Sequence, residues 1–467
     1  MKKVLTLMMS FFFVLTLSAC LGGGGRAETT VNVLDELPDE PIEIVLWTAF
    51  GDANAALLQQ MFDSFEAMYP QVSVIQLGQG GYTGLRESVI QAIVAGTTPT
   101  MTFGYPDHFV EYLNGNALVP LNDYINHPEH GVDLDDFVAG FMAENSQYAD
   151  GLIYSMPFAK STEMVVYNKT VFDHHGINFD PTVPLTWDDL IDIAENSNVL
   201  GTGAMQCEYL FNVDSAANFF INSSRQWGAG YTNSDGQILI DNPTTREMLA
   251  FFDDLFDRNI VSFPIAWDES YGSIPFKDGR VCMSQGSTAG TRHNIPNLGD
   301  GKFGIFEMGI LPAVQKEGGV PSAMQQGPNI AIISDATDAE RLASWLLIKH
   351  MTSAENTAWF AMNTGYVPVR ISGFERPDYQ EFLSLIDKYE SLGWTGLTFD
   401  ERDALPYVQA AAAAFVQVDM FEFDPAFVGR VTSSGARRES ELLFEALYAG
   451  TRTIDEAIRR MLNQLGQ

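Results

Sequence analysis

The sequence predicts an α/β protein with more than one domain, and its opening segments predict a mainly parallel sheet with helices on both faces. Segments with the pattern of buried strands alternate with segments at helical spacing, and strand–helix–strand repetition favours a parallel sheet with right-handed crossovers. The chain has 467 residues, which is more than one hydrophobic core usually serves. Its hydrophobic fraction of 46% is that of a folded globular protein.

The first 20 residues resemble a bacterial lipoprotein signal. Two lysines precede a largely apolar stretch over residues 4–17, which is too short to span a bilayer. The motif LSAC, ending at Cys20, resembles a lipobox, in which residues 1–19 are cleaved off and the cysteine receives lipid. We therefore expect a lipid anchor at the extracytoplasmic face of the cell membrane, with residues 20–40 as a flexible tether. An ordinary signal peptide and a transmembrane anchor are the alternatives.

The first part of the globular region shows the clearest alternation. Residues 42–47 form an almost continuous apolar run, typical of a buried parallel strand, and residues 72–77 and 101–104 are predicted as the next strands. Apolar residues at helical spacing between them predict two helices, of which Pro70 ends the first and Gly96 the second.

Later segments are predicted to be largely helical. Thr186 is a typical helix N-cap, and Asp189 stands at the position of the capping-box acid. Residues 340–351 and 357–362 have helical spacing, and the tail from residue 404 is also mostly helical.

Composition and motifs argue against several function classes. The net charge of −34 repels nucleic acid, so no nucleic-acid partner is expected. The glycine-rich turn before Tyr82 has Thr83 where a dinucleotide fingerprint needs glycine, so it predicts an exposed tyrosine and no nucleotide cofactor. The seven histidines lack zinc-motif spacing, so no metal is expected.

Three cysteines are present, and Cys20 is accounted for by the lipobox. Cys207 and Cys282 remain as an even pair in an exported protein, so a disulfide between them is permitted. Two separate buried thiols are the alternative.

Six short motifs, spread along the chain in a fixed order, carry a resemblance to a known family. They are Trp47 after the first strand, residues 157–163 with 167–169, residues 186–190, residues 276–283, residues 326–329 and residues 364–369. Behind a lipoprotein signal, this set resembles the extracellular solute-binding proteins of carbohydrate-type ABC importers. The resemblance implies a type II periplasmic-binding-protein fold, in which two hinged α/β lobes enclose a ligand cleft.

The resemblance also implies how the chain divides. One lobe would contain residues 41–156 and about 325–370, and the other residues 157–324 and about 371–467. The lobes would close around the ligand, and membrane permease subunits would recognise the closed form. No catalytic residues are required, so we expect a binding protein rather than an enzyme. A lipid-anchored glycan hydrolase, which needs only two carboxylates, and a ligand-sensing receptor of the same fold are the alternatives.

Within the family, the motifs most resemble the glycerol-3-phosphate-binding branch, so the expected ligand is a sugar, an oligosaccharide or a polyol phosphate. The ligand contacts that this resemblance implies are Tyr82, Asp107, Ser161, Ser287, Gly327, Tyr366 and Arg430. Asp107 would occupy the position at which the family has a glutamate after the third strand. The segment around Arg430 differs in length, so Arg437 or Arg438 is an alternative receiver for a phosphate.

Overall fold

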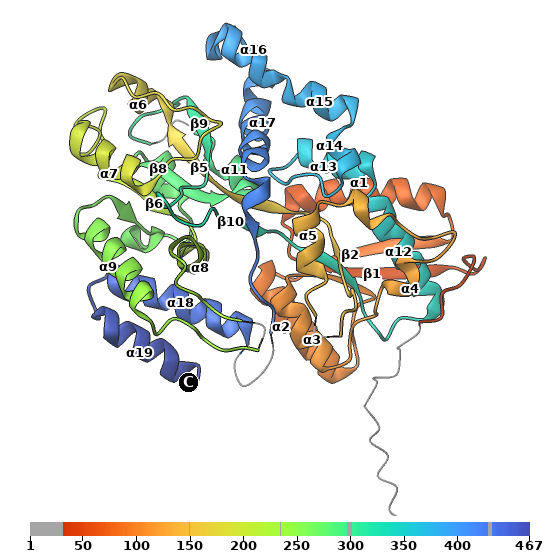
Figure 1. Cartoon of the computed structure of the whole chain (residues 1–467). Helices are drawn as coiled ribbons and strands as arrows, with labels where there is room; N and C mark the ends of the chain where they lie inside the picture. Colours follow the sequence, from red (N-terminus) through yellow and green to blue (C-terminus); the bar gives the residue numbers. More distant parts are fainter. Residues whose placement is uncertain (1–30, 149, 234, 297–300, 428–431) are drawn as a thin grey trace, which may run out of the picture.

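The computed structural model of the chain describes residues 31–148, 150–233, 235–296, 301–427 and 432–467. Helices and strands gather into two groups that lie side by side, each around its own sheet, with α17 standing between them (Figure 1). The predicted signal peptide, the lipidation site Cys20 and the predicted contact Arg430 lie outside the described residues. The α/β fold class is confirmed, and both sheets are mixed.

The first sheet has the strand order β2-β1-β3-β11-β4. Its strands are β1 (Ile42–Thr48), β2 (Val72–Gly78), β3 (Met101–Gly104), β4 (Met156–Pro157) and β11 (Asn329–Ile332). The first three run parallel to one another, as the alternation predicts. Strand β11 runs antiparallel to both of its neighbours because it enters this sheet from the second one.

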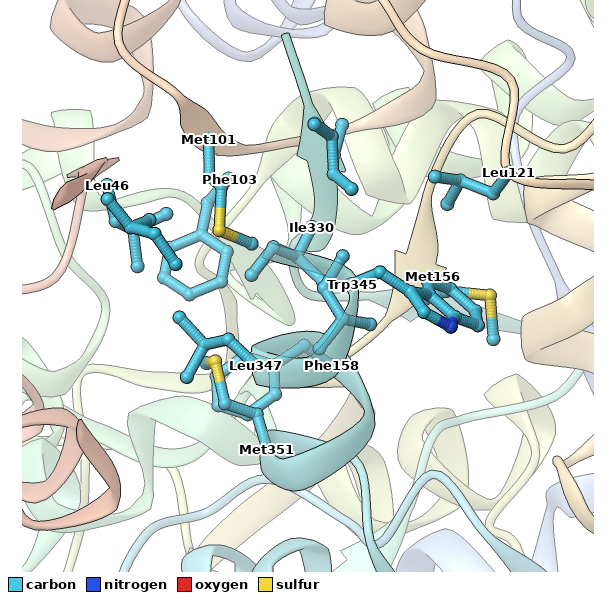
Figure 2. Close-up of a cluster of buried hydrophobic side chains, with 14 of the residues drawn as sticks. Leu46, Met101, Phe103, Leu121, Met156, Phe158, Ile330, Trp345, Leu347 and Met351 are labelled. Carbon is cyan, nitrogen blue, oxygen red and sulfur yellow. The ribbon is translucent and has the colours of Figure 1, made fainter. Parts of the chain in front are cut away.

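Helices cover the first sheet, and apolar side chains fill the space between them. These helices are α1 (Asp52–Met68), α2 (Gly81–Ala95), α3 (Pro106–Asn114), α4 (Asn122–Ile125), α5 (Ala139–Asn145), α12 (Asp338–Met351) and α13 (Ala354–Met362). Figure 2 shows Leu46, Phe103 and Ile330 of three neighbouring strands beside Trp345 and Leu347 of α12. All five side chains are fully buried, so this cluster is the core of the first group.

The second sheet has the order β12-β10-β5-β8-β6-β7, and β9 also pairs with β5. Its strands are β5 (Ser161–Asn168), β6 (Tyr209–Val213), β7 (Val261–Ser262), β8 (Val281–Ser287), β9 (Met308–Pro312), β10 (Ala323–Gln326) and β12 (Phe421–Glu422). This sheet is mixed, since β5 runs antiparallel to β8, β9 and β10, whereas β6 runs parallel to β7 and β8. The chain enters this sheet along β5 and leaves it along β10, so these two strands must point in opposite directions.

The remaining helices surround the second sheet and its connection to the first. They are α6 (Lys169–His174), α7 (Trp187–Asn196), α8 (Ala216–Trp227), α9 (Pro243–Asp257), α10 (Ser273–Lys277), α11 (Thr291–Asn294), α14 (Ile371–Phe374), α15 (Pro377–Leu383), α16 (Leu385–Leu392), α17 (Phe399–Val416), α18 (Ser433–Tyr448) and α19 (Ile454–Gln464). The predicted capping box at the start of α7 is confirmed, because Thr186 Oγ1 accepts from Asp189 N at 3.1 Å and the Asp189 carboxylate accepts from Thr186 N at 2.8 Å. The structure also joins Cys207 and Cys282 in a disulfide with an S–S distance of 2.02 Å.

The chain passes between the two sheets from β4 to β5 and again from β10 to β11. After α13 it continues into α14 and α15, where Tyr379 is buried against Ala358 and Ala361 of α13. The division into two hinged lobes, with boundaries near residues 156, 325 and 370, stays a prediction.

Candidate ligand-binding site

A cavity of about 320 Å³ lies where the two groups of elements face each other. It is lined by Tyr82, Thr83, Tyr105, Pro106, Asp107, His108 and Glu144 of the first group and by Asn218, Met324, Gln325, Gln326, Phe423, Asp424 and Arg437 on the other side. A molecule in this space would contact residues on both sides of the crossings between the sheets. Enclosure with a few convergent polar groups is typical of small-molecule sites.

Two tyrosines form an aromatic wall of this cavity. The chain turns into α2 through Gly80 and Gly81, whose φ angles of +75° and +90° suit glycine, and Tyr82 follows at once. The rings of Tyr82 and Tyr105 lie 4.8 Å apart and are tilted by 57°. The glycine turn predicts an exposed Tyr82, but its ring is partly buried and its hydroxyl is enclosed between neighbouring side chains. Burial, with Tyr366 and Tyr105 nearby, raises the pKa of this hydroxyl.

Asp107 connects the first group to α18. It lies in the first turn of α3, directly after Pro106, and its Oδ2 accepts a hydrogen bond from Ser434 Oγ at 2.6 Å. Burial alone would raise the pKa of Asp107, but attraction to His108 and Arg437 lowers it below its ordinary value. This carboxylate is therefore ionised at neutral pH and faces the cavity.

Ser161 and Ser287 meet where β5 begins and β8 ends. Ser287 pairs with Glu163 in the sheet register, and its Oγ donates to Ser161 Oγ at 3.0 Å. The Ser287 hydroxyl also accepts from Ala289 N at 3.2 Å, which caps the short 3₁₀ helix Thr288–Gly290. Ser287 lines a second cavity of about 430 Å³, which lies within the second group and also contains Asp214, Lys277 and His293.

Gly327 and Tyr366 lie against the segment that leads into β5. A Cβ atom at Gly327 would lie 1.9 Å from the carbonyl oxygen of Ala159, so only glycine allows the two crossing segments to approach this closely. Next to Tyr366, Val367 N donates to Lys160 O at 2.9 Å. The Tyr366 ring stacks on Phe360 with 5.7 Å between centroids and 14° between planes.

The structure thus brings most of the predicted contacts into one region. Tyr82 and Asp107 line the first cavity, and the other described members surround the start of β5. Of the two alternatives to Arg430, Arg437 lines the first cavity and Arg438 is exposed. Whether these residues contact a ligand stays a prediction.

A buried ion pair beside the first cavity was not predicted from the sequence. Lys160 Nζ lies 2.5 Å from Glu144 Oε2 and also donates to the carbonyl oxygen of Gly327 at 2.9 Å. The exposed fraction is 0% for the lysine and 4% for the glutamate side chain. Gln325 Nε2 donates to the same carboxylate oxygen at 2.8 Å. A lysine and a glutamate in otherwise buried segments are the signals that could have indicated the pair.

A second unpredicted network runs from β5 to the cavity wall. Glu163 Oε1 accepts from Asn218 Nδ2 at 3.0 Å, and Gln285 Nε2 donates to Oε2 at 2.9 Å. Burial raises the pKa of Glu163 to about 7 in spite of these two donors. The side-chain oxygen of Asn218 accepts from Arg437, which is also paired with Asp424. The network therefore fixes the guanidinium that faces the cavity.

In the part of the chain that the structure describes, no helix has the length and apolar character needed to cross a membrane. No group of three or more histidine, cysteine, aspartate or glutamate side chains in this part of the chain is arranged to hold a metal ion.

Sequence comparison relates the chain to binding proteins. The family model described as bacterial extracellular solute-binding protein matches residues 60–382. The sn-glycerol-3-phosphate-binding periplasmic protein UgpB of Escherichia coli (strain K12) is 23% identical over 378 residues, which cover 79% of this chain and 80% of that protein. UgpB of Pectobacterium atrosepticum is 22% identical over 354 residues, covering 73% of this chain and 76% of the relative.

Solved structures with the same fold come from the same type of protein. UgpB from Mycobacterium tuberculosis in complex with glycerophosphocholine has a TM-score of 0.70 at 19% identity, covering 92% of this chain and 98% of that one. Maltose-bound T. maritima MalE3 has a TM-score of 0.67 at 17% identity, with coverages of 91% and 99%. These likenesses confirm the predicted periplasmic-binding-protein fold.

The family match spans well over half of the chain, and it describes binding proteins rather than enzymes. The expectation of a non-enzymatic protein is confirmed by this match, and the hydrolase alternative loses its support. By family, then, this chain is one of the bacterial extracellular solute-binding proteins.

Proposed function

We propose that the chain is the solute receptor of an ABC importer for a sugar or a glycerol-phosphate compound, held at the outer face of the membrane by lipid on Cys20. The observation that carries this proposal is the cavity to which both groups of elements contribute side chains. Relatives named for sn-glycerol 3-phosphate, and structures with glycerophosphocholine and maltose, support these ligand classes.

Capture would proceed by closure of two lobes. In our proposal, the ligand enters between the lobes, the rings of Tyr82 and Tyr105 cover its apolar face, and Asp107 and Gln325 bind its polar groups. The hydrogen bond from Ser434 to Asp107 is a contact that closure would form between the two sides. The ligand then shifts the open–closed equilibrium by its differential affinity for the two states, and the permease recognises the closed form.

A ligand screen tests this function. The full chain, purified in detergent, is heated with maltose, glucosamine, sn-glycerol 3-phosphate and glycerophosphocholine, and hits are measured by calorimetry. A ligand at 100 times its dissociation constant stabilises the folded state by about 2.7 kcal/mol, which is a clear rise in melting temperature. Failure of every sugar and every glycerol-phosphate compound to bind would contradict the proposal.

A pair of tyrosine variants tests the position of the site. Tyr82→Ala removes a ring of the cavity wall and is expected to weaken binding by about tenfold or more. Tyr69→Ala is the matched control, because Tyr69 is also partly buried but packs on Phe65 at the end of α1, with 4.9 Å between the ring centroids. Equal affinity in both variants would place the ligand elsewhere.

Mass spectrometry of the membrane fraction, with Cys20→Ala as the control, tests the proposed lipid anchor on Cys20.

A further inference from the structure

The charges around the first cavity bear on which ligand it accepts. Arg437 is the one cationic side chain among the described residues that line it, and two partners already occupy its guanidinium. One nitrogen contacts Asp424 Oδ2 and another donates to Asn218 Oδ1. Burial alone would lower the pKa of Arg437, but attraction to Asp424 and Asp107 raises it. The guanidinium is thus neutralised before any ligand arrives.

Among the described residues that line this cavity, carboxylates outnumber cations. The lining contains Asp107, Glu144 and Asp424, whereas Lys160 compensates Glu144 and Arg437 can compensate only one of the two aspartates. His108 does not supply the missing charge, since burial lowers its pKa below the ordinary value of 6.5. Among the described residues, Asp107 therefore shares Arg437 with Asp424, and its other cationic neighbour, His108 at 3.9 Å, is charged only when protonated. A phosphate placed here would be repelled at short range by these carboxylates.

Buried oxygen atoms of the lining that lack hydrogen-bond partners also favour a ligand that donates hydrogen bonds over a phosphate. Gln325 Oε1 and Asp424 Oδ1 are buried acceptors without a donor among the described residues. Gln325 Nε2 already donates to Gly140 O and to Glu144, so its oxygen is correctly assigned as the free acceptor. Buried acceptors without donors cost free energy, which a ligand with O–H or N–H groups would recover. A phosphate dianion offers only acceptors and would leave them unpaired.

We propose that this cavity selects a polyhydroxylated ligand that is neutral or positively charged, such as a sugar or an amino sugar. Asp107, Asp424 and Gln325 receive hydrogen bonds from its hydroxyl or ammonium groups, and the rings of Tyr82 and Tyr105 cover its C–H face. Asp424 excludes phosphate monoesters by occupying Arg437. This inference rests on the proposed function and narrows its ligand class.

Reversal of selectivity is the test. The dissociation constants of maltose, glucosamine and sn-glycerol 3-phosphate are measured by calorimetry for the full-length parent, Asp424→Asn and Asp107→Asn. Asp424→Asn keeps the side-chain shape but removes the negative charge that neutralises Arg437. The affinity of this variant for sn-glycerol 3-phosphate is therefore expected to rise about tenfold or more. Asp107→Asn is expected to weaken glucosamine more than maltose, because it removes a charge that attracts the ammonium group.

Asp241→Asn is the matched control, because it also replaces the aspartate of an aspartate–arginine ion pair, here the pair with Arg246. This pair lies on the surface, where Asp241 is 59% and Arg246 is 40% exposed. The control variant is expected to leave all three affinities unchanged. The inference is overturned if the parent binds sn-glycerol 3-phosphate at least as tightly as both sugars, or if Asp424→Asn gains no more phosphate affinity than the control. If none of the three probes, nor glycerophosphocholine, binds to the parent or to any variant, the proposed function itself fails.

Discussion

Removal of the ammonium group of Lys160 should destabilise the protein far more than removal of a surface lysine. The side chain is fully buried, and its Nζ lies 2.5 Å from Glu144 Oε2. In Lys160→Met the carboxylate keeps the hydrogen bond from Gln325 but loses its counter-charge, and the carbonyl oxygen of Gly327 loses a donor. The perturbation therefore creates a buried, unpaired acid where the chain crosses between the sheets.

The size of the effect follows from this environment. Breaking a buried ion pair by removing one partner costs about 3–5 kcal/mol, because the remaining charge stays desolvated. Lys169→Met is the matched control: Lys169 Nζ also lies 2.5 Å from a carboxylate, that of Asp173, but these side chains are 28% and 41% exposed. Exposed pairs contribute about 0–1 kcal/mol, so the two variants should differ by at least about 2 kcal/mol.

Urea unfolding at pH 7, followed by circular dichroism and tryptophan fluorescence, measures both changes. The double variant Lys160→Met with Glu144→Gln tests the cause, since a neutral amide in place of the carboxylate should recover part of the loss. The reasoning is refuted if Lys160→Met costs less than about 1 kcal/mol. It is also refuted if the double variant is no more stable than Lys160→Met alone, because the unpaired charge would then not be the source of the cost.

Two further predictions concern stability. The pair of changes Cys207→Ala and Cys282→Ala should lower the free energy of unfolding by about 4 kcal/mol, since the disulfide closes a loop across 75 positions; an unchanged urea midpoint, with the bond verified in the parent, would contradict this. Burial raises the pKa of Glu163 from 4.5 to about 7, so its proton stabilises the folded state fully below pH 4.5 and this contribution, about 3 kcal/mol, is lost as the pH rises through 7. Glu163→Gln should therefore lose less stability between pH 5 and pH 8 than the parent, and equal losses would argue against a buried, protonated carboxyl group.

Local patterns predicted the elements that depend on local physics. The predicted strand at residues 101–104 matches β3, and Gly96 takes the left-handed conformation that ends α2. The capping box at Thr186 is formed by residues three positions apart, so the sequence alone contains it. The direction of β11 was not predictable in this way, because it depends on the sheet from which the chain arrives.

The same distinction separates the predicted site residues from the missed ones. Motifs of a known family indicated Ser161 and Ser287, which do meet although they are far apart in the chain. Glu144 lies in α5 and Lys160 in the segment between β4 and β5, and no periodicity links them. Arg437 could be weighed as a cation from the sequence, but its neutralisation by neighbours from two other segments could not.

The residues around the start of β5 explain why the chain crosses between the two sheets close to the candidate ligand-binding site. Lys160 binds Glu144 of the first group, Ser161 receives the hydroxyl of Ser287, and Glu163 holds Asn218 at the cavity wall. Residues at the start of β5 and directly before it therefore contact both groups of elements and the candidate site. If the two groups move as hinged lobes, any rotation must pass through this segment, so a ligand that fixes its side chains would also restrict the rotation. A variant that loosens the buried pair at Lys160 should for the same reason weaken ligand binding, whereas the surface variant Lys169→Met should not.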